Sequence, residues 1–357
     1  MRAAFNPDRV VGILALVLAV IAPLILPTYW IGVLLTQMLF LGIVAASLIF
    51  LSAYGGMVSL AQVSIYGIAG FVVGNATTNG NTKGLNLGWN PWWGVVVGVV
   101  IAVAVALLFG ALASRSIGIY FLMITLTYSV IANLVFGQVT DVSGFGGISG
   151  IPAPHAIGNV AAHHNRLYYV TLVVALAIYF LLRYVARTPF GLTLQGVRDD
   201  PVRMASLGYN VPLHRTIAFA FAGFVAAVGG VLFVWWNGHI DPASIDLGAT
   251  IDVLVIAVIG GLYRIEGAWV GALFFVIINN YSQQISFIGP RFDTLIGAIF
   301  LVIVLVSPGG LVGLWERVVN LSYGRRRGPS DRNPIEVGQA EASVLKEAMT
   351  PPSLGTS

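Results

Sequence analysis

Long apolar runs separated by short polar stretches dominate the sequence. Between Arg9 and Lys83 the chain contains no Asp, Glu, Lys or Arg. A helix needs about 20 apolar residues, at about 1.5 Å per residue, to cross a bilayer. Six segments fit this length: residues 10–27, 30–53, 92–113, 117–137, 167–185 and 216–236. Four others are shorter or interrupted: residues 56–73, 251–263, 267–281 and 292–306.

The composition supports a membrane protein and excludes several function classes. Hydrophobic residues make up 57% of the chain and charged residues 9%, whereas soluble domains carry about 25% charged residues. The sequence therefore predicts an all-α polytopic membrane protein with about ten transmembrane segments, some short or broken. The absence of cysteine excludes disulfides and thiolate metal sites. The five histidines lack His-Glu-x-x-His spacing, so no metal site is expected.

The basic residues test this topology. If the N-terminus is cytoplasmic and all ten segments cross, the 18 basic residues lie inside except for Lys83, Arg166 and Arg291. This distribution follows the positive-inside rule. It predicts a cytoplasmic N-terminus over residues 1–9, a transmembrane domain over residues 10–315, and a largely disordered cytoplasmic tail over residues 316–357. The basic excess then reflects topology and contact with membrane lipid, and no nucleic-acid partner is expected.

The cytoplasmic segment over residues 186–215 contains the signals of a short helix. Asp200 is a suitable N-cap, Pro201 suits the first helical position, and Gly208 suits the position just after a helix. The sequence thus predicts a two-turn helix over residues 201–207, flanked by arginines. A solvated loop that only obeys the charge rule is one interpretation, and a docking helix for a cytoplasmic partner is the other.

Four blocks of sequence carry a family resemblance. The block over residues 188–211 reads TPFGLTLQGVRDDPVRMASLGYNV, and it resembles the cytoplasmic coupling loop of branched-chain amino acid ABC importer permeases. Three further blocks fall in the same family's order. They are GGMVSLAQVSIYGIAG at 55–70, the stretches GHIDPAS, IDVLVIAVIGG and GAWVGA between residues 238 and 272, and SPGGLVGL at 307–314.

This resemblance implies the M-type permease subunit of a high-affinity branched-chain amino acid importer, with a type II-importer-like helical bundle in the bacterial inner membrane. The implied partners are a second homologous permease subunit, one or two cytoplasmic ATPase subunits and an extracytoplasmic solute-binding protein. The sequence departs from the family at Gln195, Arg203 and Met204. The residues expected to couple the permease to the ATPase are Gly191, Arg198, Asp199, Asp200, Pro201, Ala205, Leu207 and Gly208.

The chain lacks the means to bind ATP by itself. A phosphate-binding loop requires the pattern Gly-x4-Gly-Lys-Ser/Thr. The two lysines are followed by Gly84 and Glu347 instead. The sequence therefore predicts a transport subunit without a cofactor and without enzymatic activity, whose ATP and Mg²⁺ are bound by partner ATPase subunits.

Glycine-interrupted segments occur in both halves of the chain. Paired short segments of this kind indicate a transport pathway, although small residues also permit tight helix packing. Polar groups at membrane depth usually face the bundle interior. The candidate path residues are Ser59, Gln62, Ser64, Gly67, Gly70, Gly260, Gly261, Gly271 and Asn279.

Other functions remain open from the sequence. A similar permease for urea, short amides or other amino acids is one alternative to leucine, isoleucine and valine. A stand-alone channel or secondary transporter is another, and it would not need a docking helix. A membrane enzyme is the third, although no nucleophile–base pair stands at helical spacing.

Overall fold

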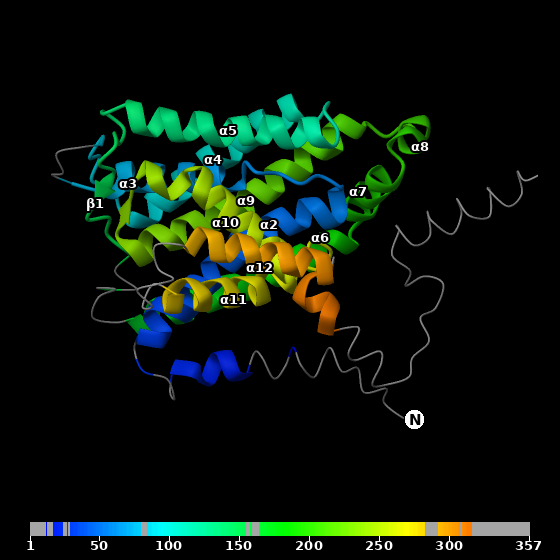
Figure 1. Ribbon diagram of the computed structural model, residues 1–357. Helices are drawn as coiled ribbons and strands as arrows, with labels where there is room; N and C mark the ends of the chain where they lie inside the picture. Colours follow the sequence, from blue (N-terminus) through cyan, green and yellow to red (C-terminus); the bar gives the residue numbers. More distant parts are fainter. Residues whose placement is uncertain are drawn as a thin grey trace, which may run out of the picture. The chain divides into compact units, whose positions relative to one another are not determined.

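The computed structural model describes residues 12, 17–23, 27, 29–79, 84–154, 158, 164–282, 292–307 and 309–315. Met1–Gly313 forms one compact unit and Leu314–Ser357 a second. In the first unit, helices lie side by side as a bundle (Figure 1). The predicted segments 1–9 and 316–357, and most of the predicted first span, lie outside the described residues.

Five helices are long and apolar enough to cross a membrane, which confirms a polytopic all-α fold. They match five of the six long segments predicted from the sequence. The first combines the π-helix η1 (Trp30–Leu35) with α2 (Thr36–Gly55). The others are α4 (Pro91–Ala113), α5 (Ile119–Gln138), α6 (His164–Arg187) and α9 (Val211–Asn237).

The four shorter predicted segments also form helices: α3 (Gln62–Thr77), α10 (Leu247–Gly260), α11 (Gly267–Ser282) and α12 (Phe292–Val306). Their 14 to 16 residues span roughly 21–24 Å at about 1.5 Å per residue. This is less than the hydrocarbon core of about 30 Å. They are therefore the short or broken segments of the bundle.

The prediction of a helix starting at residue 56 is wrong. Gly56 has a left-handed backbone (φ +64°) and its N–H bonds to the carbonyls of Leu51 and Ser52, which ends α2. The chain then runs non-helically to Gln62, where α3 begins. Ser47 in the middle of α2 donates a hydrogen bond to Gln62 Oε1 at 3.2 Å. The segment over residues 56–61 thus turns back along α2 before α3 begins.

The core consists of α2, α3 and α9, which pack against one another and are buried along most of their length. Helix α4 covers α3 and α9 through a single stripe of small residues. Small residues at such spacing let helix backbones approach closely in a membrane. The buried residues of α4 are Gly94, Gly98, Ala102, Ala106, Gly110 and Ala113.

A two-stranded pairing closes one end of the bundle. Strand β1 (Ile148–Ser149) pairs antiparallel with β2 (His239–Ile240), and the 3-10 helix η2 (Pro242–Ile245) follows β2. This links the connection after α5 to the connection after α9. At the opposite end, α7 (Pro189–Asp199) and α8 (Pro201–Ser206) join α6 to α9 (Figure 1).

Candidate functional site

Helix α7 was not predicted from the sequence. Thr188 caps it by accepting a hydrogen bond from the Gly191 N–H at 3.3 Å, and Pro189 occupies its first position. A Cβ at Gly191 would overlap the Val185 carbonyl oxygen, so only glycine permits the sharp passage from α6 into α7. The Thr-Pro pair was the available signal, because Thr at the N-cap and Pro at the next position start helices.

Arg198 fastens α7 to the end of α2. Its guanidinium donates a hydrogen bond to the Ala53 carbonyl oxygen and forms an ion pair with Asp199 at 2.7 Å. A Cβ at Gly56 would lie 2.7 Å from Arg198 Cγ, so Arg198 packs directly over the turn that ends α2. The bond satisfies one of the last carbonyls of α2, which have no partner within the helix.

The short helix α8 forms where the sequence predicts it. Asp200 caps it by accepting from the Arg203 N–H at 2.9 Å, and Gly208 adopts a left-handed backbone (φ +89°) after it. The helix ends at Ser206, so Leu207 is its C-cap rather than its last residue. No residue of α8 is buried, including Ala205 and Pro201.

Two apolar side chains of the α8 region face outward. Val202 is 75% exposed and Leu207 is 67% exposed. Two of the three departures from the family, Met204 and Gln195, have packing roles. Met204 packs α8 onto α7, since a Cβ at Gly196 would lie 2.9 Å from Met204 Sδ. Gln195 Nε2 donates to the carbonyls of Ala186 and Gly191, both at 3.1 Å.

The polar path candidates at the start of α3 lie buried beside α2. Ser64 donates to the Ala61 carbonyl at 2.7 Å, and Ser59 accepts from the Ala61 N–H at 3.2 Å. Gln62 accepts a bond from Ser47, but its Nε2 has no hydrogen-bond partner in the part of the chain that the structure describes. The backbone therefore satisfies the serines, and Gln62 retains an unused buried donor.

The glycine candidates all lie at close contacts between elements. A Cβ at Gly67 would overlap Ile245, and one at Gly70 would lie 2.5 Å from Ile240 Cδ1 and 2.7 Å from Val234 Cγ2. For the glycines in the second half of the chain, the close contacts are with backbone atoms. A Cβ at Gly260 would overlap the Gly267 carbonyl, one at Gly271 the Ile256 carbonyl, and one at Gly261 (φ +119°) the Gly309 carbonyl. These contacts support tight packing through small residues.

A pocket of about 230 Å³ lies between α2, α3, α9, η2, α10 and α11. Its polar lining includes Gln37, Tyr66, Asp252 and Asn279, and most of the remaining lining is aliphatic or aromatic. Of the path residues predicted from the sequence, Asn279 alone lines it. The sequence analysis did not include Gln37, Tyr66 or Asp252 among the path residues, because each side chain is separated from the others along the chain.

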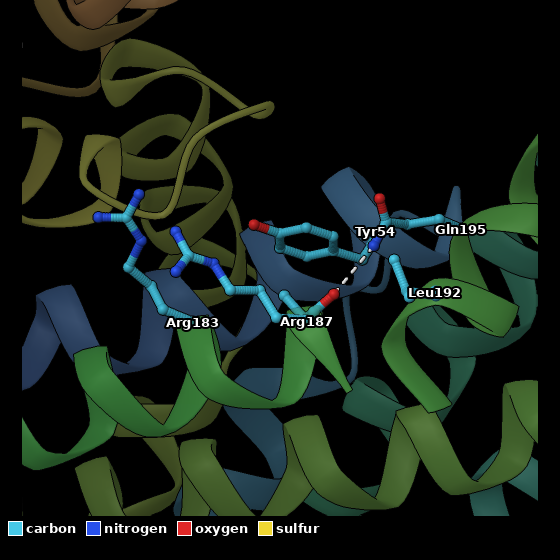
Figure 2. A pocket seen from close by; sticks show the side chains of 6 residues that line it. Tyr54, Arg183, Arg187, Leu192 and Gln195 are labelled. Atoms are coloured by element: carbon cyan, nitrogen blue, oxygen red, sulfur yellow. Dashed lines mark hydrogen bonds between the residues drawn. The ribbon is translucent and has the colours of Figure 1, made fainter. Parts of the chain in front are cut away.

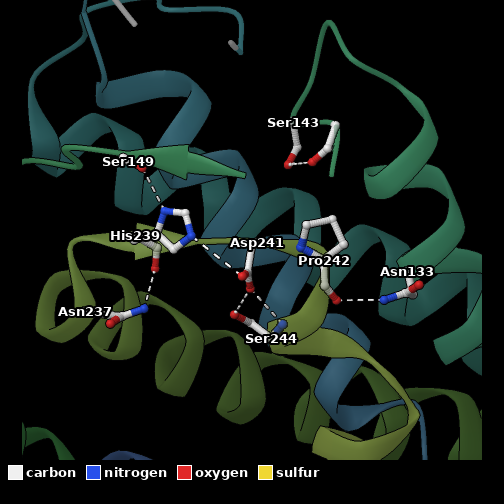
Figure 3. Close-up of polar contacts among 9 residues, drawn as sticks. Asn133, Ser143, Ser149, Asn237, His239, Asp241, Pro242 and Ser244 are labelled. Carbon is white, nitrogen blue, oxygen red and sulfur yellow. Dashed lines mark hydrogen bonds and ion pairs between the residues drawn. The ribbon is translucent and has the colours of Figure 1, made fainter. Parts of the chain in front are cut away.

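Polar contacts fix the β1–β2 end of the bundle (Figure 3). Ser149 Oγ lies 2.9 Å from His239 Nδ1, and Asp241 accepts hydrogen bonds from the Ser244 N–H at 3.0 Å and hydroxyl at 2.6 Å. Asn133 of α5 donates to the Pro242 carbonyl at 2.7 Å. These bonds hold η2 against α5. Among the described residues, no group of His, Asp and Glu is arranged to hold a metal ion.

Comparison with known proteins identifies the family. The model of a family described as the permease component of branched-chain amino acid transport systems matches residues 31–305. The chain belongs to this family. The matched range covers α2, α4 to α9 and the first three sequence blocks, whereas the block at residues 307–314 lies beyond it. The family resemblance is confirmed.

Individual relatives are distant. The high-affinity branched-chain amino acid transport system permease protein LivM of Salmonella typhimurium is 22% identical over 59% of this chain and 55% of its own length. LivH of Escherichia coli is 29% identical over 41% of this chain and 46% of its own length. The galactose/methyl galactoside import permease protein MglC of Salmonella typhimurium is 26% identical over 54% of each chain. The chain spans about half the length of the curated relatives it matches. No solved structure matches it.

The protein has a strong charge asymmetry between its two ends. Of the eight basic residues that the structure describes, Arg166 alone lies near the β1–β2 end. The acidic residues at that end include Asp141, Asp241 and Asp246. The other seven basic residues lie at the end that carries α7 and α8: Arg115, Arg183, Arg187, Arg198, Arg203, Arg215 and Arg264.

Proposed function

We propose that this protein is the membrane-spanning permease subunit of an ATP-binding cassette importer, and that α8 docks a cytoplasmic ATPase subunit. The main support is the contrast between α7 and α8. Leu194 and Val197 of α7 are fully buried, and Arg198 bonds to α2. Val202 of α8 and Leu207 directly after it are instead exposed. A short helix with exposed apolar side chains, joined to a helix that is packed and hydrogen-bonded to α2, can transmit movement from a partner to the transmembrane helices.

The charge asymmetry supports a cytoplasmic location for α8. Arginines near membrane helices are retained on the cytoplasmic side of a membrane, and seven of the eight described basic residues lie at the α8 end. On this orientation both chain termini are cytoplasmic, in a bacterial inner membrane. The β1–β2 end then faces an extracytoplasmic solute-binding protein. A second homologous permease subunit completes the assembly.

Branched-chain amino acids are the proposed substrate. LivM and LivH, which the chain resembles, are named as branched-chain amino acid permeases, whereas the relative MglC is named for galactose import. The pocket lining combines a carboxylate and amides with aromatic and aliphatic side chains, which suits an ammonium group beside an apolar side chain. Urea, short amides and other amino acids are the alternative substrates, and a stand-alone channel is the alternative mechanism.

The proposed path leads through this pocket, with Asn279 and Asp252 in its wall. We place the continuation of the path at Ser59, Gln62 and Ser64, which are buried around the start of α3, where Gln62 accepts a hydrogen bond from Ser47. The glycines of α3, α10 and α11 hold the helices around the pocket at short distance. The chain needs no cofactor of its own in this scheme, because the ATPase subunits bind ATP and Mg²⁺.

Co-purification tests the docking role. Val202→Asp and Leu207→Asp should each reduce the amount of co-expressed ATPase subunit that is retained on the tagged permease. Leu247→Asp is the matched control, since Leu247 is 51% exposed at the first position of α10, where an acidic residue is favourable. Full retention of the ATPase by both α8 variants would disprove the assignment. Leucine uptake into ATP-loaded vesicles that carry the permease and its ATPase, with the solute-binding protein added outside, tests the substrate separately.

A further inference from the structure

A pocket at the α8 end of the bundle has no role in the proposed transport function. It has a volume of about 430 Å³ and lies where the ends of α2 and α6 meet α7. Figure 2 shows the Arg183 and Arg187 side chains on the same side of α6, one helical turn apart, with the Tyr54 ring beside Arg187. The lining residues, called here the arginine pocket, are Tyr54, Arg183, Ala186, Arg187, Leu192 and Gln195.

The arginine pocket carries one uncompensated positive charge. Arg183 forms an ion pair with Glu266 at 3.3 Å and donates to the Tyr179 hydroxyl at 2.7 Å. Arg187 forms no ion pair and donates no side-chain hydrogen bond within the described part of the chain. A ligand with a single negative charge would neutralise the pocket.

The other polar groups of the pocket suit a phosphodiester with a hydroxyl-bearing headgroup. A guanidinium binds phosphate oxygens through two parallel hydrogen bonds, and the Tyr54 hydroxyl is a further donor. Gln195 uses its amide N–H groups on Ala186 and Gly191, which leaves its carbonyl oxygen as an acceptor. The pocket therefore offers donors for phosphate and one acceptor for a hydroxyl.

An exposed apolar stripe runs along α6 to this pocket. Val173 is 65% exposed, Phe180 61% and Tyr184 70%. Their spacing of seven and four residues places them on one face of the helix, and Arg187 follows one turn after Tyr184. Tyrosine favours the headgroup layer of a membrane. The stripe thus connects the hydrocarbon region with the positively charged pocket.

We propose that the arginine pocket binds the phosphodiester headgroup of an anionic membrane phospholipid, whose acyl chains lie along the exposed stripe of α6. Basic pockets between membrane helices on the cytoplasmic side suit such headgroups. The bound lipid contacts α2, α6 and α7 together, so it stabilises the base on which α8 stands. The site does not depend on which solute the permease carries.

Lipid titration of the detergent-purified full-length chain tests this proposal. Short-chain phosphatidylglycerol should raise the melting temperature of the wild-type chain in a saturable way. The Arg187→Gln variant should bind about tenfold more weakly or worse, as expected for loss of hydrogen bonds to a charged group. Arg187→Lys should retain part of the affinity, because it keeps the charge but loses the planar fork.

Three controls separate the alternatives. Arg115→Gln removes an arginine at the same end but outside the pocket, so its affinity should equal that of the wild type. Short-chain phosphatidylcholine, whose headgroup carries no net charge, should bind more weakly, and inorganic phosphate alone should produce no shift at equal concentration. The proposal is overturned by wild-type affinity in Arg187→Gln, or by equal binding of inorganic phosphate. If Arg187→Gln leaves lipid affinity unchanged and also abolishes ATPase co-purification, the proposal is overturned and the ligand of Arg187 is a carboxylate of the ATPase subunit.

Discussion

At the residue scale, Arg198 connects the docking region with the transmembrane core. Its hydrogen bond reaches the Ala53 carbonyl oxygen at the end of α2, whereas its ion pair with Asp199 lies in solvent, with 64% of the Asp199 side chain exposed. Exposed ion pairs contribute about 0–1 kcal/mol, and a hydrogen bond from a charged group contributes about 1.5–3 kcal/mol. The bond to α2 is therefore the stronger of the two.

Arg198→Gln should loosen α7. Loss of the bond to Ala53 leaves a carbonyl of α2 without its partner, so we expect faster amide hydrogen exchange over residues 189–199 while the membrane helices stay protected. Asp199→Asn, which removes only the exposed ion pair, should exchange like the wild type. Equal exchange in both variants would show that Arg198 does not hold α7 to α2.

Gly208→Val should weaken ATPase docking through the backbone alone. A Cβ at Gly208 would meet no atom within 4 Å, but the residue has a φ of +89°. A left-handed conformation costs an L-residue about 1–2 kcal/mol, so the end of α8 should unravel. We expect reduced ATPase co-purification and transport at wild-type membrane levels. Gly208→Asn is the control, because asparagine also adds a side chain but tolerates a left-handed backbone. Normal transport in the Gly208 variant would contradict this prediction.

At the scale of elements, α3 and α9 cross closely at Gly230. A Cβ at Gly230 would overlap the backbone carbonyl of Tyr66, whereas one at Gly70 would come too close only to the methyl groups of Ile240 and Val234 and would make ordinary contact, at 3.7 Å, with the Gly230 carbonyl oxygen. Side-chain methyls can rotate away, but a helix backbone cannot move without displacing its neighbours. The two glycines of this crossing therefore differ in their tolerance to substitution.

Gly230→Ala should lower the thermal stability of the purified permease more than Gly70→Ala. Overpacking a buried contact costs about 1–3 kcal/mol, and only part of this is offset by the better helix propensity of alanine, at about 1 kcal/mol. The measurement is the midpoint of thermal unfolding in detergent. A Gly230→Ala variant as stable as the wild type would mean that α3 and α9 are further apart.

The elements that could be predicted from the sequence are those whose determining residues lie within the element itself or one turn from its ends. Five long apolar runs match helices within a few residues, and Asp200, Pro201 and Gly208 marked α8 because each acts within one turn. The start of α3 was missed, since residues 56–61 are as apolar as a helix and their path depends on Gly56 and on the contact between Gln62 and Ser47. Pocket residues such as Gln37 and Asp252 come together only through packing of distant helices.

At the scale of the whole molecule, the distribution of basic residues between the two ends of the bundle supports the proposed orientation in the membrane. Seven of the eight basic residues in the described part of the chain lie at the end that carries α8, and the β1–β2 end carries Asp141, Asp241 and Asp246. A membrane protein with this distribution inserts with its arginine-rich end in the cytoplasm. Orientation thus determines which partner meets which surface, because ATP is available only to the cytoplasmic end.

Single-cysteine labelling tests this orientation. The natural chain has no cysteine, so Ser206→Cys in α8 and Thr140→Cys after α5 give one reactive thiol each, both at exposed positions. A membrane-impermeant maleimide added to intact cells should label Thr140→Cys only, and Ser206→Cys should react only after the membrane is opened. Labelling of both on the same side would require an additional or missing crossing between α5 and α8. The reverse pattern would place α8 outside, where no ATPase could dock.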